Sequence, residues 1–284
     1  MKSLLVIFCL YFCLESSFGQ IDKIEISSEG VILNAFLYHA PGGETKPTII
    51  WMHGLPGKKE TGSLELAIEL NKHNVNVIAF DYRGLWNNQG IYTVENSQKD
   101  LNSVIEFAFN PENSAKFDID TNRIIVAGHS YGSTMAAISG VLNNKVREIM
   151  CIGLADLSYI IREFYNPNTF DGRAIVQNFK DGLWGPDKLI QNFDEFILDL
   201  TFNNYKYDFV AHAKKLLDNR MLIIVGSNDL TVPIEYHFFP LYRKLRELKH
   251  PDIKYIITDS GHNFTDISES EKAEIIASWI NSND

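Results

Sequence analysis

The chain has 284 residues, of which 45% are hydrophobic and 22% are charged, so it is long and apolar enough to fold around a sizeable core. Its formal net charge of −10 argues against nucleic acid or an anionic membrane surface as a partner. These values indicate a soluble globular protein, made of one large α/β domain or two small ones.

The first 19 residues have the composition of a secretory signal peptide. A lysine near the start is followed by an apolar run over 4–14 that is too short to span a bilayer comfortably. Ser17 and Gly19 have the small-residue spacing of a cleavage site, which predicts a secreted or periplasmic protein whose mature chain begins at Gln20. The alternative is an N-terminal anchor that is never cleaved. After signal removal we expect no membrane association.

Two of the three cysteines lie inside this signal, so only Cys151 belongs to the mature chain. One cysteine excludes a disulfide framework and a cysteine metal site. Because Cys151 falls in an apolar run, we expect a buried and inert thiol.

In the mature chain, strands and helices alternate. The pattern begins with a β-hairpin formed by residues 21–26 and 31–39 around a Ser-Ser-Glu-Gly turn. The elements expected next are strand 47–53, helix 61–73, strand 75–81, helix 95–109, strand 123–128, helix 135–142 and strand 148–155. Strands that are apolar throughout predict a mostly parallel sheet with helices on both faces.

The alternation stops at residue 156 and resumes after residue 212. Residues 156–212, called the insertion below, contain no clean strand but hold 12 of the 34 aromatic residues. Strand 220–229, helix 235–247, strand 253–259 and helix 269–281 then complete the chain. We therefore expect a signal peptide over 1–19 and a single α/β domain over 20–284, with a helical, aromatic-rich insertion that lies over a site as a lid. Its aromatic side chains line an apolar pocket, pack the insertion onto the sheet, or do both.

Ser130 is the candidate nucleophile. It lies in Gly-His-Ser-Tyr-Gly, directly after the apolar strand 123–128 and before a helix rich in small residues. A sharp turn between strand and helix exposes the serine oxygen, and Gly128 and Gly132 stand where a larger side chain would collide with the strand or helix. The pattern alone is weak, and a glycine-rich turn without a chemical role is the alternative.

A serine needs a base, and His262 is the best placed of eight histidines. It follows the last strand, where a loop reaches the carboxyl edge of the sheet. His129 adjoins Ser130, but we expect it to pack beside the turn. Asp229 ends the preceding strand and is the first choice for the acid that orients the base. Asp156 is the alternative acid, whereas Asp259 is expected to form a turn.

An oxyanion site completes the set. Residues 53–57 form a glycine-containing turn after strand 47–53, so the backbone N–H groups of Leu55 and Tyr131 are the expected donors. His53 would then be a buried scaffold residue.

Turn, nucleophile, acid and histidine occur in an order that resembles the α/β-hydrolase superfamily over nearly all of the mature chain. Residues 53–93 are most similar to bacterial prolyl-oligopeptidase-like and serine-aminopeptidase-like hydrolases. Such proteins often have a second glycine and a serine where this chain has Trp86 and Asn88, in a loop that shapes the pocket of relatives. The serine at position 130 disfavours relatives that open epoxides or displace halide, since those carry aspartate there.

The sequence thus predicts a secreted serine hydrolase that cleaves an ester or amide bond of a small-molecule ester or peptide through an acyl-enzyme, with no metal or organic cofactor. Carboxylesterase and aminopeptidase or dipeptidyl-peptidase activity remain open. A peptidase would need a charge to hold a peptide amine. The acidic candidates in the insertion are Glu163, Asp171, Asp194 and Glu195, which equally suit a solvated face. A non-catalytic binding protein on the same fold is the remote alternative and predicts a degraded triad. Oligomeric state is left open.

Overall fold

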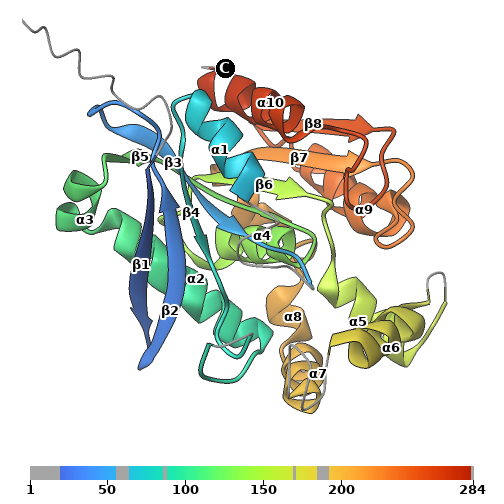
Figure 1. Ribbon diagram of the computed structural model, residues 1–284. Coiled ribbons are helices and arrows are strands. Elements are labelled where there is room, and N and C mark those ends of the chain that lie inside the picture. Colours follow the sequence, from blue (N-terminus) through green and yellow to red (C-terminus); the bar gives the residue numbers. More distant parts are fainter. Residues whose placement is uncertain (1–19, 56–63, 86–87, 169–170, 184–191, 283–284) are drawn as a thin grey trace, which may run out of the picture.

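An eight-stranded sheet runs through the protein (Figure 1). A computed structural model describes residues 20–55, 64–85, 88–168, 171–183 and 192–282. The strands are β1 (Ile21–Ser28), β2 (Val31–Tyr38), β3 (Lys46–Met52), β4 (Asn76–Phe80), β5 (Ile119–His129), β6 (Glu148–Ile152), β7 (Arg220–Gly226) and β8 (Ile253–Thr258). The segment expected to be a signal peptide lies outside the described residues, so that expectation stays a prediction.

The order of the strands is β1-β2-β4-β3-β5-β6-β7-β8. The hairpin expected at the start is present, because β1 pairs antiparallel with β2, and β2 pairs antiparallel with β4. Every other pair of neighbours is parallel. The carboxyl ends of the parallel strands therefore meet at one edge, where open α/β sheets place their sites.

Strand composition follows strand position. β4 and β6 are buried along their whole length, as expected of strands covered on both faces. β8 departs from the expectation of strands that are apolar and buried throughout, since Tyr255 and Ile257 are exposed. The reason is that β8 lies at the edge of the sheet, with one neighbour instead of two.

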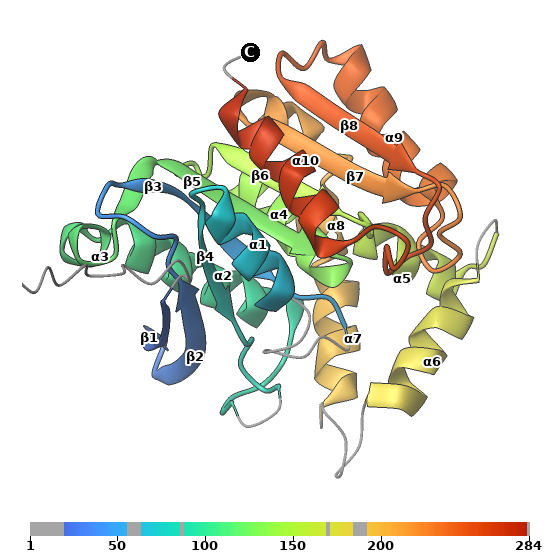
Figure 2. The same ribbon diagram turned by 45° about the horizontal axis from the view of Figure 1, so that its top comes forward.

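Helices cover both faces of the sheet, as the alternating pattern predicts (Figures 1 and 2). One buried cluster joins the sheet to α1 (Leu64–Lys72) and α10 (Glu269–Asn281), and a second joins it to α2 (Val94–Phe109), α4 (Tyr131–Leu142) and α9 (Ile234–Glu247). The short helix α3 (Pro111–Lys116) was not expected. Asn110 caps its N-terminus and a proline stands in its first turn, a start signal that the sequence carried.

The insertion is helical where it is described. It contains α5 (Leu157–Tyr165), α6 (Gly172–Leu183), α7 (Phe193–Phe202) and α8 (Asn204–Tyr207), which gather at one end of the sheet in both views (Figures 1 and 2). Within the described ranges, no helix anywhere combines the length and the apolar character needed to cross a bilayer.

One carboxylate joins the insertion to the sheet helices. Asp199 on α7 accepts hydrogen bonds from the backbone N–H of Glu95 at 2.8 Å and from the hydroxyl of Tyr207 at 2.7 Å. Glu95 lies in the first turn of α2, where N–H groups have no acceptor within the helix and attract negative charge. The contact therefore fixes α7 against α2.

Candidate active site

Ser130 lies at a sharp turn between β5 and α4. Its backbone has φ 54° and ψ −118°, a conformation that costs a non-glycine residue energy and needs support from its surroundings. That support includes the backbone N–H of Ser130, which donates to the carbonyl of Ile152 on β6 at 2.9 Å. The helix begins at Tyr131, four residues before the start expected from the sequence.

The glycines on either side of Ser130 have the steric role expected of them. A Cβ on Gly128 would lie 2.7 Å from the carbonyl oxygen of Met52, and one on Gly132 would lie 2.9 Å from that of His53. Neither approach is tolerable for a carbon atom, so both positions exclude side chains. The end of β3 and the start of α4 are thereby packed closely around the serine.

Ser130, His262 and Asp229 form a continuous hydrogen-bonded chain. The Oγ of Ser130 is 2.9 Å from Nε2 of His262, and Nδ1 of His262 is 2.7 Å from Oδ2 of Asp229. A carboxylate on Nδ1 favours the tautomer with its proton there, so Nε2 is left as the acceptor for the serine proton. The structure thus brings together the three residues singled out in the sequence.

Asp229 is held rigidly at the end of β7. Its side chain is buried, and Oδ1 accepts the backbone N–H groups of Thr231 and Val232 at 2.9 Å each. Those two bonds fix one carboxylate oxygen and leave the other for His262.

The two other acids considered lie elsewhere. Asp156 caps α5, where its Oδ1 accepts the N–H of Tyr159 at 3.0 Å. Burial raises its pKa to about 7. Asp259 holds a turn, as expected, through a 2.7 Å bond from Asn228. Neither has a described bond to His262, whereas Asp229 does.

His129 has a closer role than the packing expected of it. Its Nε2 donates to the backbone carbonyl of His262 at 2.8 Å, and the two rings lie 4.9 Å apart. Burial, followed by the nearby His262, lowers the pKa of His129 to about 4, so the ring is neutral at pH 7. His129 therefore supports the loop that carries the base. The sequence shows that His129 directly precedes Ser130, but it does not show in which direction the side chain of His129 points.

Two more buried histidines surround the site. His53 has its Nδ1 2.7 Å from the carbonyl of Gly54, and burial lowers its pKa to about 4, which fits the scaffold role expected of it. His237 on α9 accepts the N–H of Asp156 at Nδ1, over 2.9 Å. Burial lowers the pKa of His237 to about 3, so this ring is also neutral.

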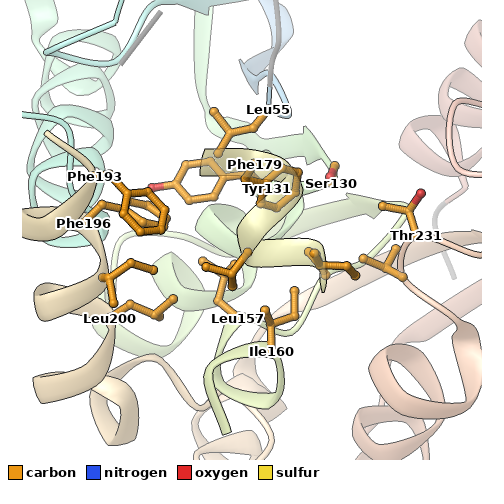
Figure 3. A pocket seen from close by; sticks show the side chains of 15 residues that line it. Leu55, Ser130, Tyr131, Leu157, Ile160, Phe179, Phe193, Phe196, Leu200 and Thr231 are labelled. Carbon is orange, nitrogen blue, oxygen red and sulfur yellow. The ribbon is translucent and has the colours of Figure 1, made fainter. Parts of the chain in front are cut away.

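Leu55 and Tyr131, the expected oxyanion donors, both lie beside Ser130 in the lining of one pocket (Figure 3). Tyr131 is the first residue of α4, and N–H groups in a first turn have no acceptor within their helix. The assignment of the two donors stays a prediction.

An apolar pocket extends from Ser130 between the sheet and the insertion (Figure 3). Side chains of α5, α6 and α7 form most of its wall: Leu157, Ile160, Ile175, Val176, Phe179, Phe193, Phe196, Ile197 and Leu200. Aliphatic residues outnumber aromatic ones there. Several aromatic side chains of the insertion are exposed instead, among them Phe202 and Tyr205, so only part of the aromatic content serves the pocket.

Comparison with known proteins places this arrangement in a family. The family model named BD-FAE matches residues 36–181, which include the end of β2, strands β3 to β6, the turn at Ser130 and residues 156–181 of the insertion. The chain belongs to the BD-FAE family. The closer likeness to prolyl-oligopeptidase-like and serine-aminopeptidase-like hydrolases expected from residues 53–93 stays a prediction.

Curated relatives of this BD-FAE member include YfhR of Salmonella typhi, described as an uncharacterized protein. It is 26% identical over 220 residues, which are 76% of this chain. YfhR of Salmonella typhimurium is 27% identical over the same length. The chain spans 64% of the length of these two relatives.

Solved structures share the fold. The Pyrococcus furiosus esterase Pf2001 superposes with a TM-score of 0.65 at 18% identity, covering 93% of this chain and 92% of its own. Est1E of Butyrivibrio proteoclasticus, solved with ferulic acid bound, gives 0.64 at 18%, over 90% and 96%. A 2,6-dihydroxy-pseudo-oxynicotine hydrolase gives 0.66 at 17%, over 92% and 68%. The BD-FAE member therefore has the α/β-hydrolase fold predicted from its sequence.

The acidic candidates for an amine anchor do not line the described pocket of this BD-FAE chain. Glu163 is buried and accepts the N–H of Asn168 at 2.7 Å, and Asp171 accepts the N–H of Ala174 at 3.1 Å. Asp194 and Glu195 are exposed in the first turn of α7, which suits the solvated face that was the alternative.

In the loop after β4, Trp86 lies outside the described residues. Asn88 donates to the carbonyls of Asp81 and Tyr82 at 3.0 and 3.1 Å, so it closes the loop on itself. Cys151 is buried, and burial raises its pKa to about 12, as an inert thiol requires. Over the described residues, no three His, Cys, Asp or Glu side chains are grouped to hold a metal ion.

Proposed function

We propose that this BD-FAE protein is a secreted serine hydrolase that cleaves carboxylic esters through an acyl-enzyme. The observation that carries the proposal is the chain of two short hydrogen bonds, 2.9 Å from Ser130 Oγ to His262 Nε2 and 2.7 Å from His262 Nδ1 to Asp229 Oδ2. These are the contacts that activate a serine for attack and steady the imidazolium that results.

The chemistry proceeds in two halves. The Oγ of Ser130 attacks the ester carbonyl carbon while His262 Nε2 takes the serine proton. The C–O bond to the alcohol then breaks, and His262 gives that proton to the departing oxygen. In the second half, His262 takes a proton from water, the resulting hydroxide attacks the acyl-enzyme, and the proton returns to Ser130 as the acid leaves.

Negative charge on the carbonyl oxygen during both halves calls for donors. The N–H groups of Leu55 and Tyr131 are the proposed pair, because both residues line the pocket beside Ser130. One such donor typically contributes roughly 3 kcal/mol to stabilising the transition state.

The pocket supports an ester in preference to a peptide. Its described lining contains neither a carboxylate to hold a peptide amine nor a cation to hold a carboxyl terminus. Among the solved structures, Pf2001 is an esterase, which agrees with this preference, although its low identity to this chain carries only the fold. The intact bond chain also weighs against a non-catalytic binding protein, for which we expect a degraded triad.

A fluorophosphonate probe tests the proposal. We expect it to label the wild-type protein and to leave Ser130→Ala unlabelled, because the probe reacts with an activated serine. Equal labelling of the two, or labelling of neither, would contradict a serine hydrolase. A panel of nitrophenyl esters beside aminoacyl anilides separates the substrate classes, and we expect turnover of the esters only.

Secretion is a separate part of the proposal and rests on the composition of residues 1–19. N-terminal sequencing of the protein recovered outside the cytoplasm should begin at Gln20. Recovery with an intact N-terminus would favour the uncleaved anchor.

A further inference from the structure

In the described lining of the pocket beside Ser130, two of the three side-chain hydroxyls stand at one end, and the hydroxyl of Tyr131 points toward the other (Figure 3). In Figure 3 the oxygens of Ser130 and Thr231 stand at one end, and the side chains of Phe193, Phe196 and Leu200 close the other. Between them, Leu55 and Tyr131 form one long side, and Leu157 with Ile160 forms the opposite side. The space is therefore an apolar slot that starts at the nucleophile and ends on α7.

Beyond Ser130 and Thr231, the described lining of the slot has one side-chain hydroxyl, that of Tyr131, and it is already hydrogen-bonded. The hydroxyl of Tyr131 donates to Ser97 Oγ on α2 at 2.9 Å, and both residues are buried. Past Ser130 and Thr231, the described lining offers a ligand apolar side chains and this engaged phenol. A polar group on the ligand would lose its water there and could meet only the phenol oxygen of Tyr131, whose proton is already donated to Ser97, so its burial is costly.

The position of the base decides which half of an ester enters the slot, given the hydrolase reaction proposed above. The departing alcohol oxygen must receive its proton from His262 Nε2, and His262 is not among the residues that line the slot. The alcohol half therefore lies on the His262 side of Ser130. The acyl half, which is bonded to Ser130 in the intermediate, is left to occupy the slot.

We propose that the slot is an acyl-chain subsite and that the substrates are esters of straight-chain, fully apolar carboxylic acids, with an upper chain length set by Phe193 and Leu200 of α7. Esters of short acids leave the slot unfilled. Esters of hydroxylated acids, whether aliphatic or aromatic, place a polar group against Phe196 and Leu200.

A series of p-nitrophenyl esters from acetate to dodecanoate measures this selectivity. We expect kcat/KM to rise about fourfold for each added methylene, the factor equivalent to about 0.8 kcal/mol per buried CH₂, and then to fall once the chain meets α7. Esters of an ω-hydroxy acid and of 3-(4-hydroxyphenyl)propanoic acid should react roughly ten to a hundred times more slowly than apolar esters of equal length. A maximum at acetate, or a preference for the hydroxylated aromatic acid, would overturn the proposal.

Variants of α7 test the far end. Phe193→Ala lengthens the slot and should move the maximum to longer chains, whereas Leu200→Phe fills it and should move the maximum to shorter ones. Phe202→Ala is the matched control, because Phe202 is on the same helix and is 81% exposed. Its profile should equal that of the wild type.

Fluorophosphonate titration of each preparation counts the active sites that react. Rates are then expressed per active site, so poor folding of a variant is not mistaken for a change in selectivity. If Ser130 is labelled but neither variant moves the maximum, the subsite is wrong and the hydrolase proposal stands. If Ser130 is not labelled in the wild type, both proposals fail.

Discussion

Ser130, His262 and Asp229 follow strands of one sheet, and each of their reacting atoms has one specific partner at 2.7 to 2.9 Å. The pocket wall beside them is built from helices α5 to α7, and its contacts are apolar and without direction. Hydrogen bonds of defined angle tolerate few substitutions, while a leucine in a pocket wall has many acceptable replacements. The chemistry of the site therefore depends on particular residue types, whereas its selectivity depends on the shape of the pocket wall.

The contrast between directed hydrogen bonds and apolar packing is tested most strongly by removing one hydrogen-bonding group of the triad while keeping the shape of its side chain. Asp229→Asn should lower kcat/KM by about 10⁴-fold, because the amide leaves His262 in the wrong tautomer and its cation without a counter-charge. Ester hydrolysis at pH 7 is the measurement. Asp156→Asn is the matched control and should stay within about tenfold of wild type. The reverse ranking would move the acid to Asp156.

The Asp156→Asn control also tests stability. Asp156 caps α5, but its burial makes the charged form of its carboxyl group unfavourable. Burial raises its pKa from 3.8 to about 7 in the folded protein. From pH 4 to 7 the folded state therefore binds more protons at this group than the unfolded state does, and stability falls as pH rises across that window.

Asp156→Asn keeps an oxygen to cap Tyr159 and removes the charge. It should raise the free energy of unfolding at pH 8 by up to about 4 kcal/mol and have much less effect at pH 4. Denaturant unfolding at the two pH values measures the difference. An equal effect at both would mean that the charge of Asp156 is not the cause.

A third variant tests the close backbone packing that holds the turn at Ser130. Gly132→Ala puts a Cβ against the carbonyls of Met52 and His53, so it should destabilise the protein by about 3 kcal/mol. Gly182→Ala on α6 is the control, because a Cβ there meets no atom of the described residues within 4 Å. In a helix that change should be neutral or stabilising by up to about 1 kcal/mol. Thermal unfolding compares the two; similar losses would contradict the steric account.

The contrast between directed hydrogen bonds and apolar packing also explains how much of the site could be predicted from the sequence. Ser130, Asp229 and His262 could be found because each stands in a short segment whose apolar run and following turn set its place on the sheet edge. The apolar strands and the helical insertion followed from periodicity. The pocket could not be traced, because which of the many apolar residues in 156–212 face Ser130 depends on how α5 to α7 pack. The expectation that the aromatic side chains of the insertion line the pocket, pack onto the sheet or do both did not foresee Phe202 and Tyr205, which are exposed.

The role of His129 could not be predicted from the sequence and becomes clear only from its contacts in the structure. Its Nε2–H donates to the carbonyl of His262 at 2.8 Å, so the ring steadies the loop of the base, and His129 is not among the residues that line the pocket. His129→Ala should lower kcat about tenfold and leave KM nearly unchanged, because a neutral hydrogen bond of about 1 kcal/mol and a ring contact are lost behind the base. His129→Gln, which retains a donor, should recover part of the rate.

The pH–rate profile separates this positioning role from a chemical one. Since the pKa of His129 is about 4, its ring does not titrate near neutral pH, and the variant should keep the wild-type shape with a lower plateau. A shifted acid limb would mean that His129 takes part in proton transfer. An unchanged kcat would mean that the loop is held by its other contacts, such as the 2.7 Å bond from Ser260 to Asp266.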